Sequence, residues 1–308
     1  MATEKDDVRK IESENHPSQQ SGGLLSSITT QSRWYWVRLL LENPAAVVGM
    51  LFLLTILILT AVMPTLSPHH VVEVNPGVRL QSPSSEFWMG TDQFGRDVLL
   101  RGIYGVRVSL MVGAFVMILS AIGGTVIGLI AGYYQRLDSP IMRVMDGLMA
   151  FPPILLAIAL MASLGPSTPN VIIALGIVYM PVVARLVRGS TLSAKEYLYV
   201  EAARSVGARD HLIMARHIFP NVMSPLIVQC TFIVAFSIIA EASLSFLGAG
   251  VPPDVPTWGS MLRDGQAVIT RAWWMVVVPG ALMFFTILAL NLVGDGLRDA
   301  MDPRSRRR

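Results

Sequence analysis

The chain has 308 residues, of which 53% are hydrophobic and only 15% are charged, and its mean hydropathy is +0.55. About a quarter of the residues in a soluble globular domain are charged, so this composition excludes an ordinary soluble protein and predicts a membrane protein. The net charge of +3 is too small to identify a partner by itself. The single cysteine, Cys230, leaves no partner for an intrachain disulfide.

The apolar stretches predict six transmembrane helices and no strands. A helix needs about 20 apolar residues to cross a hydrocarbon core of ~30 Å. The long uncharged stretch 147–184 exceeds one span, and the turn formers of "GPSTPN" divide it in two. The expected limits are 44–64, 108–132, 142–164, 170–190, 219–242 and 274–294. The fold class is therefore an all-α polytopic membrane protein.

Residues 1–33 are rich in Glu, Lys, Asp, Ser and Gln, which predicts a disordered N-terminal tail. A cleavable signal peptide would place its apolar stretch nearer the start, so the first span is expected to remain as an anchor. Most basic residues fall in alternate connecting segments that include both ends of the chain. Because cytoplasmic loops carry an excess of Lys and Arg, we expect both termini to be cytoplasmic. Residues 298–308, ending in "RSRRR", then form a basic cytoplasmic tail.

Within the spans, small and polar residues are assigned structural roles. Gly124, Gly128 and Gly132 recur every four residues, which permits close approach of a second helix. Glu241 lies late in the fifth span, so we expect it near the outer interface as a structural residue rather than a substrate ligand. The histidines show no metal-ligand spacing with acids or with Cys230, and no metal site is expected.

A polar insert interrupts the apolar chain between the fourth and fifth spans, in a loop predicted to be cytoplasmic. Ser193 and Glu196 have the spacing of a capping box, which predicts a helix start. Gly207 suits a left-handed turn at the helix end. A second short helix is expected over 210–219, and Pro220 suits the first turn of the next helix.

An exposed, partly apolar helix outside the membrane is typical of a segment that enters a partner's groove. The small side chains of Ala202 and Ala203 would let a partner approach closely. A loop that packs on its own bundle explains the same pattern, and both interpretations stay open on physical grounds. The expected apolar contacts come from Tyr197, Leu198, Val200 and Val206, and the polar ones from Glu201, Arg204 and Arg209.

The insert resembles the EAA loop of ABC importer permeases, in which Glu-Ala-Ala is followed by a glycine and, further on, by a proline. The resemblance covers essentially the whole chain from Tyr35. The chain departs from the usual pattern at two apolar positions, which are His217 and Phe219. The matching residues are Glu201, Ala202, Ala203, Gly207 and Pro220.

Two further segments resemble dipeptide and oligopeptide permeases of the C-subunit type: "GTDQFGRDVLLRGIYGVRVSL" (90–110) and "EASLSFLGAGVPPDVPTWGSML" (241–262). In the first, Asp92 with Arg96 and Asp97 with Arg101 have i,i+4 spacing. This spacing predicts an amphipathic helix at the outer surface, which either aims the second span or forms a scaffold for a partner. The family motif on this side is Gly90, Thr91, Asp92, Gly95, Arg96 and Asp97.

The resemblance implies a type-1 ABC importer permease fold: a first helix with an extracytoplasmic segment (34–104), a five-helix core (105–297) and a coupling loop (193–220). It implies that the loop couples transport to a separate ATPase. It also implies a homologous second permease, two ATPase subunits, an extracytoplasmic binding protein and a bacterial inner-membrane location. The residues that would form the coupling contact are Glu201, Ala202, Ala203, Arg204, Gly207, Ala208 and Pro220.

The chain itself is not expected to be an enzyme. It lacks the G-x-x-x-x-G-K-[ST] pattern of a P-loop, so ATP and Mg²⁺ are expected on the partner subunits, and no cofactor is expected here. The resemblance favours dipeptides or oligopeptides as substrate, with nickel or another small solute as the alternative. An ion-coupled transporter or channel is a rival of another class, although it would need buried ionisable groups near the membrane centre. A membrane scaffold without transport is a third possibility.

Overall fold

The computed structural model describes residues 38–66, 71 and 74–301, and over these residues the chain is helical. The described part contains no strand beyond one isolated bridge between Thr91 and Asp97, which confirms the all-α fold class. The predicted N-terminal tail and most of the basic tail lie outside the described residues. The long helices are α4 (Pro44–Leu66), α5 (Val98–Tyr133), α8 (Thr168–Ala194), α11 (Phe219–Phe246) and α13 (Trp274–Met301). The shorter elements are η1 (Pro76–Val78), α6 (Gln135–Met149), α7 (Pro153–Leu164), α9 (Leu198–Ser205), α10 (Asp210–Ile213), the π-helical turn η2 (Met214–Ile218) and α12 (Trp258–Gln266).

Five of the six predicted spans correspond to single helices that are long and apolar enough to cross a membrane. The third, expected over 142–164, is instead broken into α6 and α7, which meet at an angle of 91°. Pro152 and Pro153 cause the break. A proline disfavours helical geometry in the residue before it, and Pro152 accordingly has an extended ψ of 129°. The six-span prediction therefore holds only if this bent pair counts as one span.

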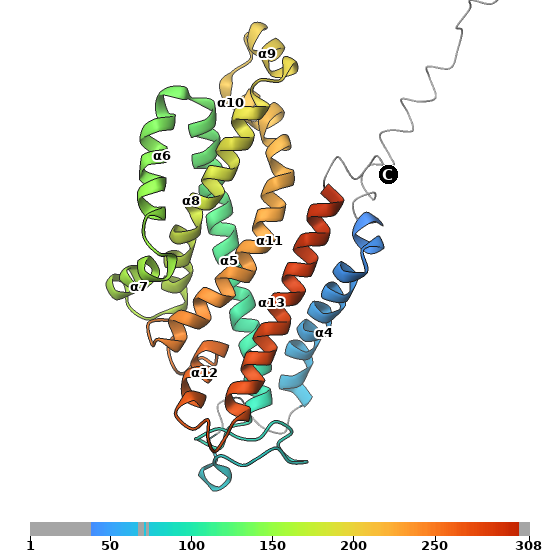
Figure 1. Cartoon of the computed structure of the whole chain (residues 1–308), viewed down its shortest axis with the longest axis vertical. Helices are drawn as coiled ribbons and strands as arrows, with labels where there is room; N and C mark the ends of the chain where they lie inside the picture. The colour runs from blue at the N-terminus through green and yellow to red at the C-terminus, as the bar shows by residue number, and fades with distance from the viewer. Residues whose placement is uncertain (1–37, 67–70, 72–73, 302–308) are drawn as a thin grey trace, which may run out of the picture.

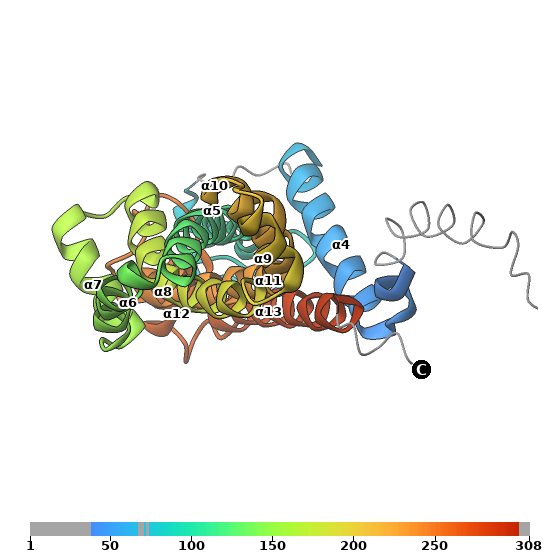
Figure 2. The ribbon, with the colours of Figure 1, turned by 90° about the horizontal axis from the view of Figure 1, so that it is seen from above.

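The long helices run side by side and place the short elements at two opposite ends (Figure 1). α9 and α10 project from one end, and α12 lies with the loop before α5 at the other. Seen from above, α4 and the α6–α7 pair lie on opposite flanks of the bundle (Figure 2). The first residues of α4 and the last of α13 lie toward the end that carries α9, as expected for an even number of crossings.

The most extensive helix contact among the described residues joins α5 to α8, and the predicted glycine stripe lies in it. A Cβ on Gly124 would lie 2.5 Å from Val183 Cβ, and a Cβ on Gly128 would lie 2.5 Å from the Ala184 carbonyl oxygen. A Cβ on Gly132 would lie 2.7 Å from Thr191 Cβ. Real Cβ atoms do not approach this closely, so the two backbones can meet only where side chains are absent. The packing role predicted for these glycines is confirmed.

Replacing Gly128 by alanine is expected to destabilise the protein by about 1–3 kcal/mol, because the added methyl group forces α5 and α8 apart. The matched control is Gly147→Ala on α6, where the new Cβ would meet nothing within 4 Å. There the helix propensity of alanine adds roughly 0.5–1 kcal/mol of stability. Thermal unfolding of the two variants in detergent measures both effects. Equal shifts in melting temperature would contradict the close helix approach.

Glu241 is completely buried, with none of its surface exposed. Its two carboxyl oxygens accept hydrogen bonds from the Ser109 hydroxyl on α5 at 3.2 Å and from the Ser245 hydroxyl at 2.8 Å. The Ser245 oxygen also accepts the backbone N–H of Val251, at 3.2 Å. Buried polar groups need such partners. Glu241 therefore links α5, α11 and the following loop, and the structure gives it a structural role.

Candidate functional site

The predicted cytoplasmic insert contains one short helix, α9, which ends in a Schellman motif. The Gly207 N–H donates to the Arg204 carbonyl at 3.0 Å, and the Ala208 N–H donates to the Ala203 carbonyl at 3.1 Å. Gly207 has φ +75°, as predicted for a left-handed turn that glycine adopts at little cost. The predicted capping box is wrong, since Ser193 belongs to the last turn of α8 and its hydroxyl bonds back to Gly189.

α9 presents one face to its own bundle and another to the surroundings. Val200 is completely buried, although it was expected at a partner contact. Ala203 and Ala208 are half-buried against the same core, whereas Ala202 is exposed. The other outward residues include two large apolar side chains at high exposure and two charged ones. These are Leu198 (83% exposed), Val206 (84% exposed), Glu201 and Arg204.

Side-chain contacts tie α9 to the ends of two long helices. The Arg204 guanidinium of α9 lies 5.7 Å from the centre of the Tyr133 ring at the end of α5, and the Tyr133 hydroxyl donates to Asp210 Oδ1, at the start of α10, at 2.8 Å. On the other side, the Asn221 amide of α11 donates to the Tyr199 hydroxyl at 2.8 Å. A displacement of α9 would therefore reach α5 and α11 directly. No role was predicted for Tyr133, Tyr199 or Asn221, because their pairing depends on tertiary contacts.

The second short helix expected over 210–219 does not stand alone. α10, η2 and α11 form one helical segment from Asp210 to Phe246. Pro220 lies in the first turn of α11, as predicted. A proline inside a continuous helix removes one hydrogen bond and clashes with the preceding turn. The wider π turn at Met214–Ile218 lies directly before Pro220 and accommodates it.

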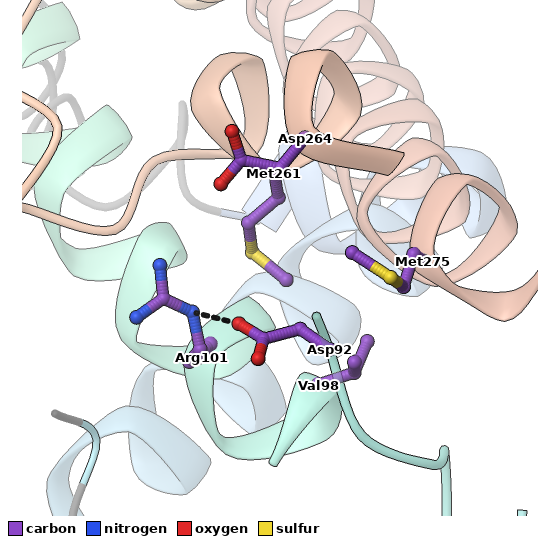
Figure 3. A pocket seen from close by; sticks show the side chains of 6 residues that line it. All are labelled: Asp92, Val98, Arg101, Met261, Asp264 and Met275. Carbon is purple, nitrogen blue, oxygen red and sulfur yellow. Dashed lines mark ion pairs between the residues drawn. The ribbon is translucent and has the colours of Figure 1, made fainter. Parts of the chain in front are cut away.

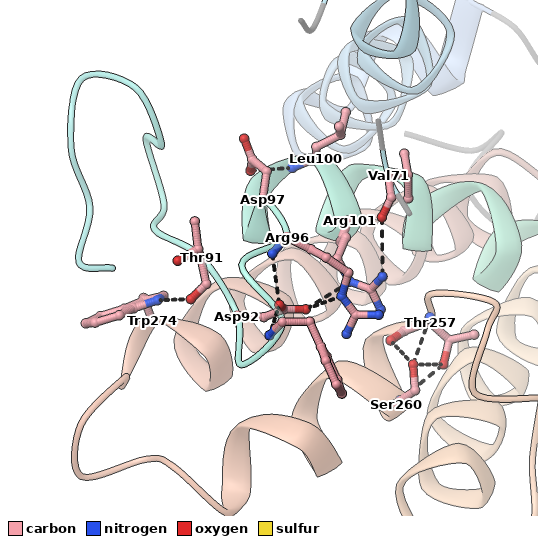
Figure 4. A network of polar contacts seen from close by, with 11 residues as sticks. Val71, Thr91, Asp92, Arg96, Asp97, Leu100, Arg101, Thr257, Ser260 and Trp274 are labelled. Atoms are coloured by element: carbon pink, nitrogen blue, oxygen red, sulfur yellow. Dashed lines mark hydrogen bonds and ion pairs between the residues drawn. The ribbon is translucent and has the colours of Figure 1, made fainter. Parts of the chain in front are cut away.

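On the opposite side of the molecule, the motif from Gly90 to Asp97 forms a tight turn and not the expected amphipathic helix. Gly90 and Gly95 have φ +71° and +78°. A Cβ on Gly95 would lie 1.8 Å from the Asn75 carbonyl oxygen, so no other residue fits there. The Thr91 carbonyl accepts the Trp274 indole N–H at 3.1 Å, which fastens the turn to the start of α13 (Figure 4).

The centre of this turn is the buried carboxylate of Asp92, which is only 4% exposed. One oxygen accepts the backbone N–H groups of Phe94 at 2.8 Å and Arg96 at 3.0 Å, and the other pairs with Arg96 Nε at 2.6 Å (Figure 4). Arg101, which is 2% exposed, lies with its Nε 3.7 Å from the same carboxylate.

The second predicted pair, Asp97 with Arg101, does not form between side chains. Asp97 instead caps α5, because its Oδ1 accepts the Leu100 N–H at 3.0 Å. Arg101 is turned towards Asp92 and contacts the Val71 carbonyl at 3.4 Å. The i,i+4 spacing therefore predicted one ion pair correctly and the helix around it wrongly. The first turn of a helix has backbone N–H groups that need an acceptor. A side-chain cap that supplies this acceptor stabilises the protein more than an ion pair between solvent-exposed side chains does.

Asp264 of α12 faces the same charged cluster across a small cavity of about 10 Å³ (Figure 3). The cavity lies between α5, α12 and α13, with Met261 and Met275 on its walls. Burial raises the pKa of Asp264, and the nearby arginines oppose that rise. The volume is about that of one water molecule and excludes a substrate. This cluster holds together the ends of α5, α12 and α13 at the end of the bundle opposite α9.

Neither region has the arrangement of a catalytic centre. Among the described residues, no group of three or more His, Cys, Asp and Glu side chains could hold a metal ion. The adjacent histidines at positions 69 and 70 lie outside the described residues. What the geometry does provide is an exposed helix at one end, connected to two long helices, and a rigid charged turn at the other.

Comparison with known proteins identifies the family. Residues 124–307, more than half of the chain, match the model described as "Binding-protein-dependent transport system inner membrane component". Residues 32–83 match the "N-terminal TM domain of oligopeptide transport permease C". The chain is also similar to an inward-facing structure of the MetNI methionine ABC transporter, with a TM-score of 0.52 and 21% identity. That alignment covers 67% of this chain and 96% of the other, and at this identity it supports the fold alone.

Similar proteins agree with this assignment. The dipeptide transport system permease protein DppC of Alkalihalophilus pseudofirmus is 44% identical over 264 residues, covering 85% of this chain and 87% of that protein. The glutathione transport system permease protein GsiD of Pectobacterium atrosepticum is 42% identical over 280 residues, covering 90% and 93%. The chain thus belongs to the inner membrane components of binding-protein-dependent transport systems and is a multi-pass permease subunit of an ABC transporter.

Proposed function

We propose that this chain is one of two permeases in an importer of dipeptides or oligopeptides, and that a separate ATPase docks on α9. The substrate class is supported by the dipeptide and glutathione permeases to which the chain is similar. Family membership is evidence against the ion-coupled transporter or channel considered from the sequence.

The observation that carries the docking proposal is the exposure of α9. Leu198 and Val206 are more than 80% exposed, although α9 is fixed to the bundle by Val200, by the contact of Arg204 with Tyr133 and by the hydrogen bond from Asn221 to Tyr199. Large apolar side chains held rigidly outside the membrane are expected to enter a partner's groove. Glu201 and Arg204 flank them and would fix the orientation of the partner.

Closure of an ATPase dimer would then move two such helices together, one on each permease. Because α9 contacts the ends of both α5 and α11, its displacement would tilt the long helices as a unit. We propose that the end carrying α9 is cytoplasmic, together with both termini. The outer turn around Asp92 would face the binding protein, and the second permease would complete the route through the membrane.

An uptake experiment tests the substrate class. Cells that contain the chain and its partner subunits are expected to accumulate labelled dipeptides or oligopeptides, and cells without the chain are expected to lose this uptake. Nickel uptake is expected to be the same in both. Loss of nickel uptake with unchanged peptide uptake would contradict the proposal and favour the alternative substrate. Peptide uptake that persists after ATP depletion would contradict the role of an ATPase.

A further inference from the structure

A cavity of about 480 Å³ lies between the second half of α8, the first half of α11 and the last turn of α13. Its apolar walls include Leu186, Val228 and Phe232. Its polar lining consists of Ser224 and Gln229 from α11 and Arg298 from the last turn of α13. In contrast to the cavity beside Asp92, this one has room for several water molecules or for a peptide segment.

The polar side chains that line the cavity have no hydrogen-bond or ion-pair partner among the described residues. Neither Ser224 nor Gln229 has a side-chain hydrogen bond to any residue that the structure describes, and Arg298 has no ion pair among those residues. Gln229 lies nine residues beyond Pro220, which is roughly 13 Å along the helix. At that depth an amide facing lipid would be costly. The cavity is therefore expected to contain water.

We infer that this cavity is the cytoplasmic part of the substrate route, in which Gln229 and Ser224 bind peptide backbone groups and Arg298 binds the terminal carboxylate. An amide side chain offers both a donor and an acceptor, which matches the two groups of a peptide bond. A guanidinium forms paired hydrogen bonds with a carboxylate. The inference rests on the proposed peptide substrate and adds the residues that contact it.

The surrounding charges favour an anionic group at Arg298. The acids nearest in the chain, Asp295 and Asp299, do not line the cavity. Asp146 is occupied by Arg185 at 2.6 Å. Among the residues that the structure describes, Arg298 is thus the one charged residue in the lining, and it stands at the mouth of the cavity because it lies in the last turn of α13. The terminal carboxylate of a peptide that moves along the cavity towards the cytoplasm would contact Arg298 last.

Thiol labelling tests whether the cavity is hydrated. Cys230 is the single cysteine, so Cys230→Ala gives a background for Gln229→Cys and Ser224→Cys. In inverted vesicles that contain the whole transporter, both thiols are expected to react with a membrane-impermeant maleimide at least roughly tenfold faster than two controls. The controls are Ile233→Cys, at a position 1% exposed on the same helix, and Ile58→Cys, at a position 53% exposed on α4. Labelling after denaturation normalises each rate.

Labelling no faster than at position 58 would overturn the inference, because it would mean that lipid or the second permease fills the cavity. If labelling is fast and becomes slower in the presence of excess peptide, the result supports the assignment of the cavity to the substrate route. Fast labelling that peptide does not change, in a transporter that imports the same peptide, contradicts a substrate route. If wild-type protein imports no peptide at all, the proposed substrate class fails, whereas the labelling rates still show whether the cavity holds water.

A second experiment tests the carboxylate contact. Arg298→Gln is expected to lower the maximal uptake rate of a peptide with a free carboxylate roughly tenfold, the factor that corresponds to loss of one charge-assisted hydrogen bond. The rate for the same peptide with an amidated C-terminus is expected to stay near wild type. Arg298→Lys is expected to restore most of the lost uptake of the peptide with a free carboxylate. Arg185→Gln, outside the cavity, is not expected to cause a selective loss of uptake for that peptide. Equal losses for both peptides would assign Arg298 a purely structural role.

Discussion

Replacing Gly207 by proline is expected to reduce peptide uptake at least tenfold while the chain still inserts and assembles. Gly207 has φ +75° and donates its N–H to Arg204. Proline fixes φ near −65° and has no N–H, so the turn after α9 cannot form. Loss of the turn releases Ala203 and Ala208 from the core and detaches α9 from α5 and α11. The measurement is uptake, together with the ATP hydrolysis rate of the purified complex.

The matched control is Gly207→Asn, because asparagine adopts the left-handed conformation more readily than other non-glycine residues. It is expected to retain most of the uptake. ATP hydrolysis that continues in the proline variant without transport would indicate uncoupling of the two processes. Normal uptake in the proline variant would refute a coupling role for this turn. Glu201→Lys should show a related defect with an intact turn, because Glu201 is exposed and only its charge changes.

Replacing Asp92 by alanine is expected to destabilise the protein by about 3–5 kcal/mol. The Asp92 carboxylate is the partner of two arginines, of which Arg101 is almost completely buried and Arg96 is only 13% exposed. Removing one member of a buried ion pair leaves an uncompensated charge, which is the costly outcome. The substitution also leaves the N–H groups of Phe94 and Arg96 without their acceptor. Thermal unfolding of the purified complex measures the loss.

Glu42→Ala serves as the control for the Asp92 substitution. Its pair with Arg38 has a similar geometry at 2.9 Å, but the two side chains are 56% and 80% exposed. Exposed pairs contribute about 0–1 kcal/mol, so little change is expected. Asp92→Asn should lie between the two, since the amide oxygen can still accept the backbone N–H groups. A melting temperature for Asp92→Ala equal to that of the Glu42 variant would show that the turn from Gly90 to Asp97 does not depend on this carboxylate.

The transmembrane helices could be predicted from local sequence because their cause is local. An apolar stretch of sufficient length must become a helix in a membrane, where every backbone group needs an internal partner. The turn at Gly207 and the start of α11 at Pro220 were likewise predictable, since each depends on the conformational limits of one residue type. The glycine stripe of α5 indicated close packing, although not that α8 was the partner.

Three of the errors concern choices between local options that tertiary contacts decided. Ser193 could have capped α9, but the hydrogen bonds of α8 extend through it. The proline pair at 152–153 could have kinked one span, but it turned the chain by 91°. Asp97 and Arg101 could have paired on a helix surface, but Asp97 caps α5 while Arg101 is buried beside Asp92. In each case two arrangements were close in local energy, and packing selected one.

The sequence by itself determined that this is an all-helical membrane protein with an exposed polar insert, because hydropathy and backbone limits act over short distances along the chain. Only the tertiary structure decided that α9 is fixed between Tyr133 and Asn221, that Arg101 is buried beside Asp92, and that Gln229 and Arg298 share a cavity. These pairs join residues from different elements, some of them far apart in the chain. Their meeting depends on how whole helices pack, which no local pattern records.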